Sequence, residues 1–199
     1  MYIRLDRAAA VFLAVLLCAT LGACTPADGG DVTTPPTEAP TEAPTEAPTE
    51  SPDDDPSDGV SAVDFRVLDW EGNTVKLSDF YGKPIVVNFW ASWCPPCKAE
   101  LPDFEAACKA YEGEVTFLMV NLTDGDRETV EIAKSYISAQ GYTFPVYFDT
   151  TYEAAYVYGI SSIPQTYFIN AEGEIVARAT GMINAAQLEQ GIGMIYTAP

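Results

Sequence analysis

The chain has 199 residues and a formal net charge of −19 at pH 7, and it contains no histidine. Without histidine, Ser-His-Asp and Cys-His catalysis and histidine-ligated metal sites are excluded. The negative charge repels phosphate backbones, so we expect no nucleic-acid partner. The chemistry left to the chain is that of thiols and carboxylates.

Residues 1–23 are predicted to be an export signal. Arg4 and Arg7 precede an apolar stretch, residues 8–17, that is too short to span a membrane comfortably. The segment ends in Leu21-Gly22-Ala23-Cys24, which resembles the signal of bacterial lipoproteins, where the cysteine is acylated and becomes the first residue. The resemblance implies lipidation at Cys24. A plain signal peptide with an incidental cysteine is the alternative.

Residues 24–59 are predicted to be a disordered acidic tether. The tetrapeptide Thr-Glu-Ala-Pro recurs, and residues 25–59 hold ten acidic residues and no basic one. Proline at every fourth position prevents a helix, and the like charges extend the chain. A tether of this length and composition reaches on the order of 100 Å.

Residues 60–199 are predicted to form the folded domain. Apolar runs, alternation and glycine stops indicate strands at residues 62–68, 74–77, 85–90, 115–121, 146–149, 165–169 and 175–180, and helices at residues 95–111, 127–139, 152–158 and 185–196. This order predicts an α/β domain with a central mixed β-sheet flanked by helices. The first two strands are expected to form an N-terminal β-hairpin extension.

The motif Trp93-Cys94-Pro95-Pro96-Cys97 lies where the buried strand 85–90 turns into a helix. Two cysteines at this spacing can close a disulfide, and the helix N-terminus stabilises a thiolate at the first. We expect Cys94, at the exposed turn, to attack a partner disulfide, and Cys97, one turn in, to be the more buried resolving thiol. A structural disulfide is the alternative.

The remaining cysteines support no metal site. A structural zinc site needs a second Cys-x-x-Cys pair, and the chain has none. Cys108 is predicted to lie on the apolar face of the helix 95–111 as a buried, inert thiol. We therefore expect no metal and no cofactor beyond the Cys94–Cys97 pair itself.

Two motifs in the right order carry a family resemblance. The cysteine turn with its preceding strand, and the later Ser162-Ile163-Pro164-Gln165, resemble thioredoxin-fold proteins, and among them the membrane-anchored TlpA/ResA-type thiol-disulfide oxidoreductases. The likeness covers residues 62–196 and implies a thioredoxin-like fold. It also implies that Pro164 is a cis-proline beside the cysteines and that the Ile163 backbone pairs with substrate. Trp93, Pro95 and Pro96 are the further substrate-binding residues expected.

Glu100 is the third predicted catalytic residue. Thioredoxin has a buried aspartate six residues before its first cysteine, and here that position is Asn88, which cannot titrate. The TlpA/ResA-like proteins have a glutamate where this chain has Glu100, one helical turn after Cys97. The resemblance implies a buried carboxyl group with a raised pKa. A solvated helix residue is the alternative.

The sequence thus predicts a lipid-anchored thiol-disulfide oxidoreductase at the extracytoplasmic face of the bacterial cell membrane. We expect a monomer that reduces exported proteins, such as apocytochrome c or an oxidised enzyme, with a CcdA/DsbD-like membrane electron donor. One alternative is a peroxiredoxin-like thiol peroxidase, although Ala91 stands where a peroxidase has threonine or serine. The other is a non-catalytic binding lipoprotein with a structural disulfide.

Overall fold

The computed structural model describes residues 60–198. The predicted lipoprotein signal at residues 1–23, the lipidation site Cys24 and the acidic tether lie outside these residues. Within residues 60–198, no helix combines the length and the hydrophobicity that a membrane crossing requires.

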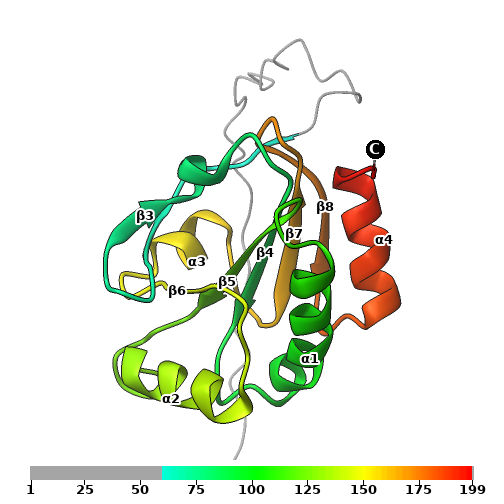
Figure 1. The fold of residues 1–199 in the computed structure, drawn as a ribbon. Coiled ribbons are helices and arrows are strands. Elements are labelled where there is room, and N and C mark those ends of the chain that lie inside the picture. Colours follow the sequence, from blue (N-terminus) through cyan, green and yellow to red (C-terminus); the bar gives the residue numbers. More distant parts are fainter. Residues whose placement is uncertain (1–59, 199) are drawn as a thin grey trace, which may run out of the picture. The chain divides into compact units, whose positions relative to one another are not determined.

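A mixed sheet of eight strands forms the centre of the domain (Figure 1), in the order β1-β8-β7-β4-β5-β6-β2-β3. The strands are β1 (Val60–Ser61), β2 (Arg66–Leu68), β3 (Thr74–Lys76), β4 (Ile85–Trp90), β5 (Thr116–Asn121), β6 (Val146–Phe148), β7 (Gln165–Ile169) and β8 (Glu174–Thr180). The neighbours β4, β5 and β6 run parallel, and the other pairs are antiparallel. The predicted mixed sheet is therefore confirmed.

Helices cover both faces of the sheet. They are α1 (Pro95–Ala110), α2 (Val130–Gln140), α3 (Glu153–Val157) and α4 (Ala185–Ile195), with a 3-10 turn, η1, at Leu77–Phe80. Buried side chains of α1, α2 and α4 form one apolar cluster with one face of the sheet, and those of η1 and α3 join the cluster on the other face. Figure 1 shows α1 and α4 side by side.

Strand β4 is buried along its whole length. Val86 and Trp90 point into the cluster beneath α1, whereas Val87 and Phe89 point into the opposite cluster. Because side chains alternate along a strand, Asn88 shares the face of Val86 and Trp90. The alternation thus places one polar side chain inside the core beneath α1.

The first predicted strand, residues 62–68, is shorter in the structure. Only Arg66–Leu68 pairs with β3, and Val60–Ser61 pairs with β8 at the other edge of the sheet. Between them the Asp64 carboxylate accepts hydrogen bonds from the backbone N–H and the hydroxyl of Ser78, at 2.9 and 2.8 Å. These side-chain bonds and two isolated backbone bonds, from the Ala62 N–H to the Gly173 carbonyl and from the Leu77 N–H to the Phe65 carbonyl, take the place of a continuous strand ladder. The alternation reflects burial of Phe65 under the sheet.

Helix α4 lies close to strand β7. A Cβ atom built on Gly191 of α4 would lie 2.2 Å from a ring carbon of Phe168, which is 3% exposed. Gly193, on the same helix, has no heavy atom within 4 Å of such a Cβ atom. A side chain at the buried position 191 would therefore meet the Phe168 ring, whereas one at the exposed position 193 would meet no neighbour.

We expect Gly191→Ala to destabilise the domain by about 1–3 kcal/mol, because the packed Phe168 ring cannot move away without strain. Gly193→Ala is the matched control and should stabilise the helix by about 0.5–1 kcal/mol. Urea denaturation of the full chain measures both. Equal shifts of the two midpoints would contradict the close packing.

Candidate active site

The two cysteines of the motif are joined at the boundary between β4 and α1. Cys94 is the N-cap residue of α1, and its Sγ atom is bonded to Cys97 Sγ, with the two Cα atoms 5.3 Å apart. The backbone N–H of Cys97 points at Cys94 Sγ from 3.2 Å. In the reduced protein the same N–H and the helix N-terminus favour a Cys94 thiolate.

Both cysteines are buried, which corrects the expectation that Cys94 lies at an exposed turn. Cys94 is 3% exposed and Cys97 is fully buried. Its neighbours Trp93, Pro95 and Pro96 are the exposed residues of the turn. Cys94 is the cysteine that lines a surface groove of about 460 Å³. Of the two sulfur-bearing residues, Cys94 is therefore the one that is accessible from the groove.

The groove has predominantly apolar walls. Trp93, Pro95 and Pro96 line one part of it, and Ile163, Tyr152 and Leu122 line the rest with Ile160 and two serines. Among residues 60–198, none of those that line the groove is charged. The predicted substrate-binding residues Trp93, Pro95, Pro96 and Ile163 thus come together around Cys94.

The Ile163–Pro164 peptide bond is cis, as the resemblance implied. The Ile163 carbonyl oxygen lies 3.8 Å from Cys94 Sγ, so this loop borders the disulfide directly. Pro164 itself is buried, and its carbonyl oxygen accepts a hydrogen bond of 2.9 Å from the Gly181 N–H. Of the two residues, Ile163 is therefore the one that lines the groove.

Glu100 is buried one helical turn beyond Cys97, with 1% of its surface exposed. The Asn88 side-chain amide donates to Glu100 Oε1 at 2.8 Å, and the Ile183 backbone N–H donates to Oε2 at 2.9 Å. Burial raises the pKa of Glu100 from 4.5 to about 7, and the two hydrogen bonds oppose that rise without cancelling it. The structure thus excludes a solvated helix residue.

Asn88 connects Glu100 to the sheet. Its Nδ2 atom also lies 3.1 Å from Thr166 Oγ1 on the neighbouring strand β7, and its Oδ1 atom has no hydrogen-bond partner among the described residues. As drawn, the amide donates to an ionised Glu100. A half-turn of the amide would present Oδ1 to a protonated Glu100, so the one side chain suits both states.

Cys108 differs from its prediction as a buried thiol, because it is only half-buried. Burial raises the pKa of this thiol, and the nearby carboxylates of Glu105 and Glu112 add to the rise. It lies eleven residues along α1 from Cys97, or about 16 Å at the rise of an α-helix. Cys108 is therefore out of reach of the cysteine pair.

Three residues near the cysteines were not predicted from the sequence. Glu128 is fully buried and accepts hydrogen bonds from Ser92, Arg127 stacks on Trp93, and Tyr152 lines the groove with a left-handed backbone, φ 58°. The first two follow strand β5. Because the carboxyl ends of neighbouring parallel strands meet at one edge of a sheet, the loop after β5 was the place to look.

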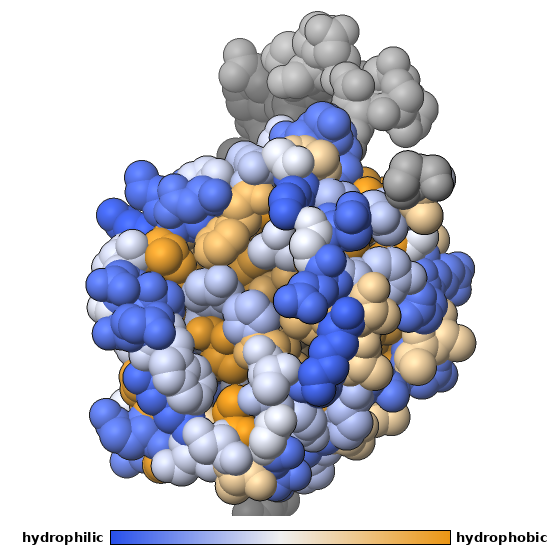
Figure 2. Space-filling view, in the orientation of Figure 1, coloured by the Kyte–Doolittle hydropathy of each residue, from blue (hydrophilic) through white to orange (hydrophobic). Residues whose placement is uncertain are grey.

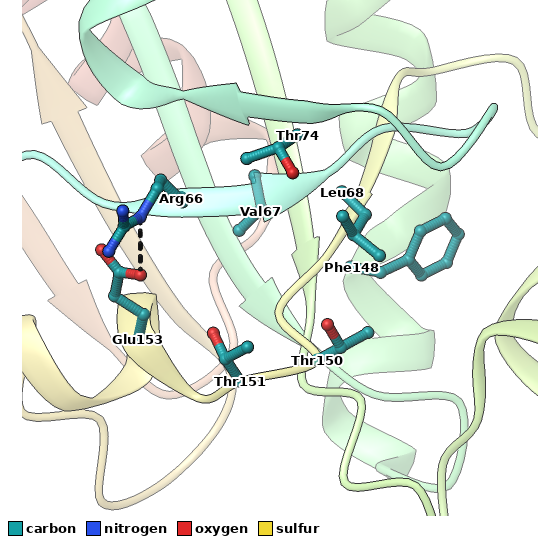
Figure 3. Close-up of a pocket in the computed structure, with 8 residues that line it drawn as sticks. All are labelled: Arg66, Val67, Leu68, Thr74, Phe148, Thr150, Thr151 and Glu153. Atoms are coloured by element: carbon teal, nitrogen blue, oxygen red, sulfur yellow. Dashed lines mark hydrogen bonds and ion pairs between the residues drawn. The ribbon is translucent and has the colours of Figure 1, made fainter.

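A second cavity, of about 520 Å³, lies between β2 and the start of α3 (Figure 3). Arg66 and Glu153 face each other across one side of it as an ion pair of 3.1 Å, and Thr150 and Thr151 line another side. None of the described residues that line this cavity is a cysteine. It therefore contributes no group to the thiol chemistry of the groove.

Comparison with known proteins identifies close relatives. The model of the AhpC/TSA family matches residues 59–178. The thiol-disulfide oxidoreductase ResA of Bacillus subtilis is 33% identical over 138 residues, which are 69% of this chain and 75% of that protein.

Solved structures agree with these matches. The crystal structure of StoA from Bacillus subtilis has a TM-score of 0.57 and 32% identity, and the match covers 65% of this chain and 96% of that one. The crystal structure of the pneumococcal exposed lipoprotein thioredoxin Etrx1, from Streptococcus pneumoniae, has a TM-score of 0.56 and 31% identity, covering 66% and 98%.

The buried Glu100 makes stability depend on pH in a predictable direction. Its pKa is raised in the folded state, so it stabilises the fold below about pH 4.5 and loses that contribution as the pH rises to about 7. We expect the wild-type chain to lose on the order of 3 kcal/mol over this range relative to Glu100→Gln. Glutamine can keep both hydrogen bonds if Asn88 turns its amide.

Urea denaturation of both chains at several pH values between about 4 and 8 measures this difference. Carboxylates elsewhere titrate equally in the two chains and cancel. Parallel pH profiles would show that Glu100 does not titrate in this range.

Proposed function

Because the chain belongs to the AhpC/TSA family and is a thiol-disulfide oxidoreductase of the ResA type, we propose that it reduces disulfides in exported proteins. The observation that carries the proposal is the Cys94–Cys97 pair at a helix N-terminus, with Cys94 lining a groove beside the cis Ile163–Pro164 bond. In this arrangement a partner disulfide can reach the sulfur of Cys94, while the buried sulfur of Cys97 remains available for the resolving step.

The reaction is a two-step exchange. The Cys94 thiolate attacks one sulfur of the substrate disulfide, and the other substrate sulfur leaves as a thiolate. Cys97, as a thiolate, then attacks Cys94 Sγ, which breaks the mixed disulfide and releases the second substrate sulfur. The substrate gains two electrons and two protons, and the enzyme is left with the Cys94–Cys97 disulfide.

Glu100 is the group that we assign to the proton of Cys97. It lies three residues further along α1, and a pKa of about 7 lets it accept a proton near neutral pH and return it. Asn88, at the position of the thioredoxin aspartate, has no proton to exchange. In this chain the proton acceptor is therefore on helix α1, at Glu100, and not on strand β4.

The groove limits what can reach Cys94. Its apolar walls suit an extended segment that carries an apolar side chain beside the cysteine, and the Ile163 backbone lies where such a segment would pass. Trp93, Pro95 and Pro96 would contact this segment from the side of α1. Pro164 acts by holding Ile163 in place.

We further propose that the protein is a monomer held by lipid on Cys24 at the extracytoplasmic face of the bacterial membrane. The signal-like sequence at residues 1–23 supports this, as does the description of a relative, Etrx1, as an exposed lipoprotein. Disulfides persist outside the cytoplasm, so a reductase there needs electrons from across the membrane, from a donor of the CcdA/DsbD kind. Apocytochrome c and oxidised enzymes such as methionine sulfoxide reductases are the candidate substrates.

Trapping in cells tests the reaction. In the full chain, Cys97→Ser should accumulate mixed disulfides between Cys94 and its substrates, because the resolving step is lost. A reductant should cleave them. The double variant Cys94→Ser/Cys97→Ser is the control and should form none. If Cys97→Ser forms no adducts and the wild-type chain exchanges no disulfides, the redox function is wrong. Turnover of peroxide would instead support a thiol peroxidase, and a bridge that resists strong thiols would support a structural disulfide.

Cell fractionation tests the anchor. Cys24→Ala removes the thiol that would be acylated, so the chain should move from the membrane fraction to the soluble extracytoplasmic fraction or keep an uncut signal. Cys108→Ser, which leaves the signal intact, should stay in the membrane fraction. Equal partitioning of wild type and Cys24→Ala, with the signal removed from both chains, would rule out lipidation at this residue.

A further inference from the structure

The turn that presents Cys94 is held by two residues from the next strand's loop. A backbone hydrogen bond of 3.2 Å from the Cys94 N–H to the Ala91 carbonyl closes the turn. Ser92 and Trp93 are its two central residues. Both residues lie beyond the end of β4, so strand pairing does not fix their positions. Contacts with other segments must fix them.

Glu128 holds the first of these residues. It is fully buried, and Ser92 donates to it twice, from the backbone N–H to Oε1 at 2.8 Å and from the hydroxyl to Oε2 at 2.6 Å. The Asn121 side-chain amide, at the end of β5, donates to the same Oε1 atom at 2.7 Å. One carboxylate therefore links the turn after β4 to the end of β5.

Arg127 holds the second residue. Its guanidinium carbon lies 3.9 Å from the centre of the Trp93 ring, within cation–π distance. Trp93 is 36% exposed and forms a wall of the groove. Two consecutive residues of the loop thus contact two consecutive residues of the turn. Arg127 stacks on Trp93, and Glu128 accepts hydrogen bonds from Ser92.

The loop that supplies these two residues is itself fixed. The Asp124 carboxylate accepts hydrogen bonds from the backbone N–H groups of Asp126 and Glu128, at 2.9 and 2.8 Å. The Gly125 N–H donates to the Glu128 carbonyl at 2.9 Å. These hydrogen bonds fix the backbone from which the side chains of Arg127 and Glu128 extend.

We propose that Arg127 and Glu128 form a positioning clamp on Ser92-Trp93 that fixes the groove wall and the approach of a protein disulfide to Cys94. The proposal rests on the proposed function for its kinetic consequence. Glu128 acts through hydrogen bonds, and Arg127 acts through its stack on Trp93. Neither residue touches the reacting sulfur atoms.

Three variants of the full chain separate the clamp from general stability. Glu128→Ala removes all three hydrogen bonds. Glu128→Gln keeps them, because its Oε1 accepts from Ser92 and Asn121 while its amide donates to the Ser92 hydroxyl. Arg127→Met keeps the length of the side chain and removes the cation. Lys134→Met is the matched control, since Lys134 lies 5.2 Å from the ring of Trp70, a tryptophan as exposed as Trp93 but outside the groove.

Insulin reduction with dithiothreitol as the electron source gives kcat and KM for a protein disulfide. We expect kcat/KM to fall about tenfold in Glu128→Ala, to return to within about twofold of wild type in Glu128→Gln, and to fall through a raised KM in Arg127→Met. Lys134→Met should match wild type. A folded Glu128→Ala with wild-type kcat/KM, or a Glu128→Gln as slow as Glu128→Ala, would overturn the clamp.

Acrylamide quenching of Trp93 fluorescence, taken as the difference from a Trp93→Phe chain, reports the clamp without any catalysis. Quenching should rise in Arg127→Met and stay at the wild-type level in Glu128→Gln. If Glu128→Ala does not fold, unchanged quenching and KM in Arg127→Met overturn the proposal. A wild-type chain that fails to reduce insulin contradicts the proposed function, and the quenching result then still decides the clamp.

Discussion

A buried carboxyl group that has no cation among its hydrogen-bond partners in residues 60–198 organises the site. Glu100 lies inside the core, where an unpaired charge is costly, and only two hydrogen bonds offset that cost. One donor comes from strand β4 and the other from the loop before α4, so the carboxyl ties α1 to two other parts of the fold. The incomplete compensation is what brings its pKa to about 7. The same incompleteness makes the group useful as a proton acceptor.

Much of the fold followed from the sequence because single local signals dominate it. The run Ile85–Trp90 is buried on both faces and apolar except for Asn88, as expected of a central strand, and the helix beginning after Cys94 has Pro95 and Pro96 in its first turn. The resemblance supplied what periodicity could not, including the cis bond before Pro164. Such a bond has a low base rate from sequence alone.

The features that could not be predicted from the sequence depend on contacts between residues that are far apart along the chain. Glu128 accepts a hydrogen bond from Ser92 across 36 residues of sequence, whereas the sequence pattern predicts a helix at residues 127–139 and gives no sign of this contact. The helix begins at Val130, because the Thr129 hydroxyl caps it by accepting from the Ile132 N–H. The burial of Cys94 was missed for a related reason. Its cover comes partly from Ile163 on a distant loop, which no local pattern reports.

The pairing of β1 with β8 fixes the end of the sheet at which Val60 lies. Val60 pairs with Ile175 of β8, Ile175 pairs with Ile169 of β7, and Ile169 pairs with Ile85. Val60 therefore lies at the same end of the sheet as Ile85, the first residue of β4. Cys94 follows the other end of β4. Six strand residues, or about 20 Å, separate these two ends of the sheet. Figure 2 shows hydrophilic side chains interspersed with hydrophobic ones over one face of the domain. Val60, the first residue that the structure describes, and the cysteine pair therefore lie at opposite ends of the sheet.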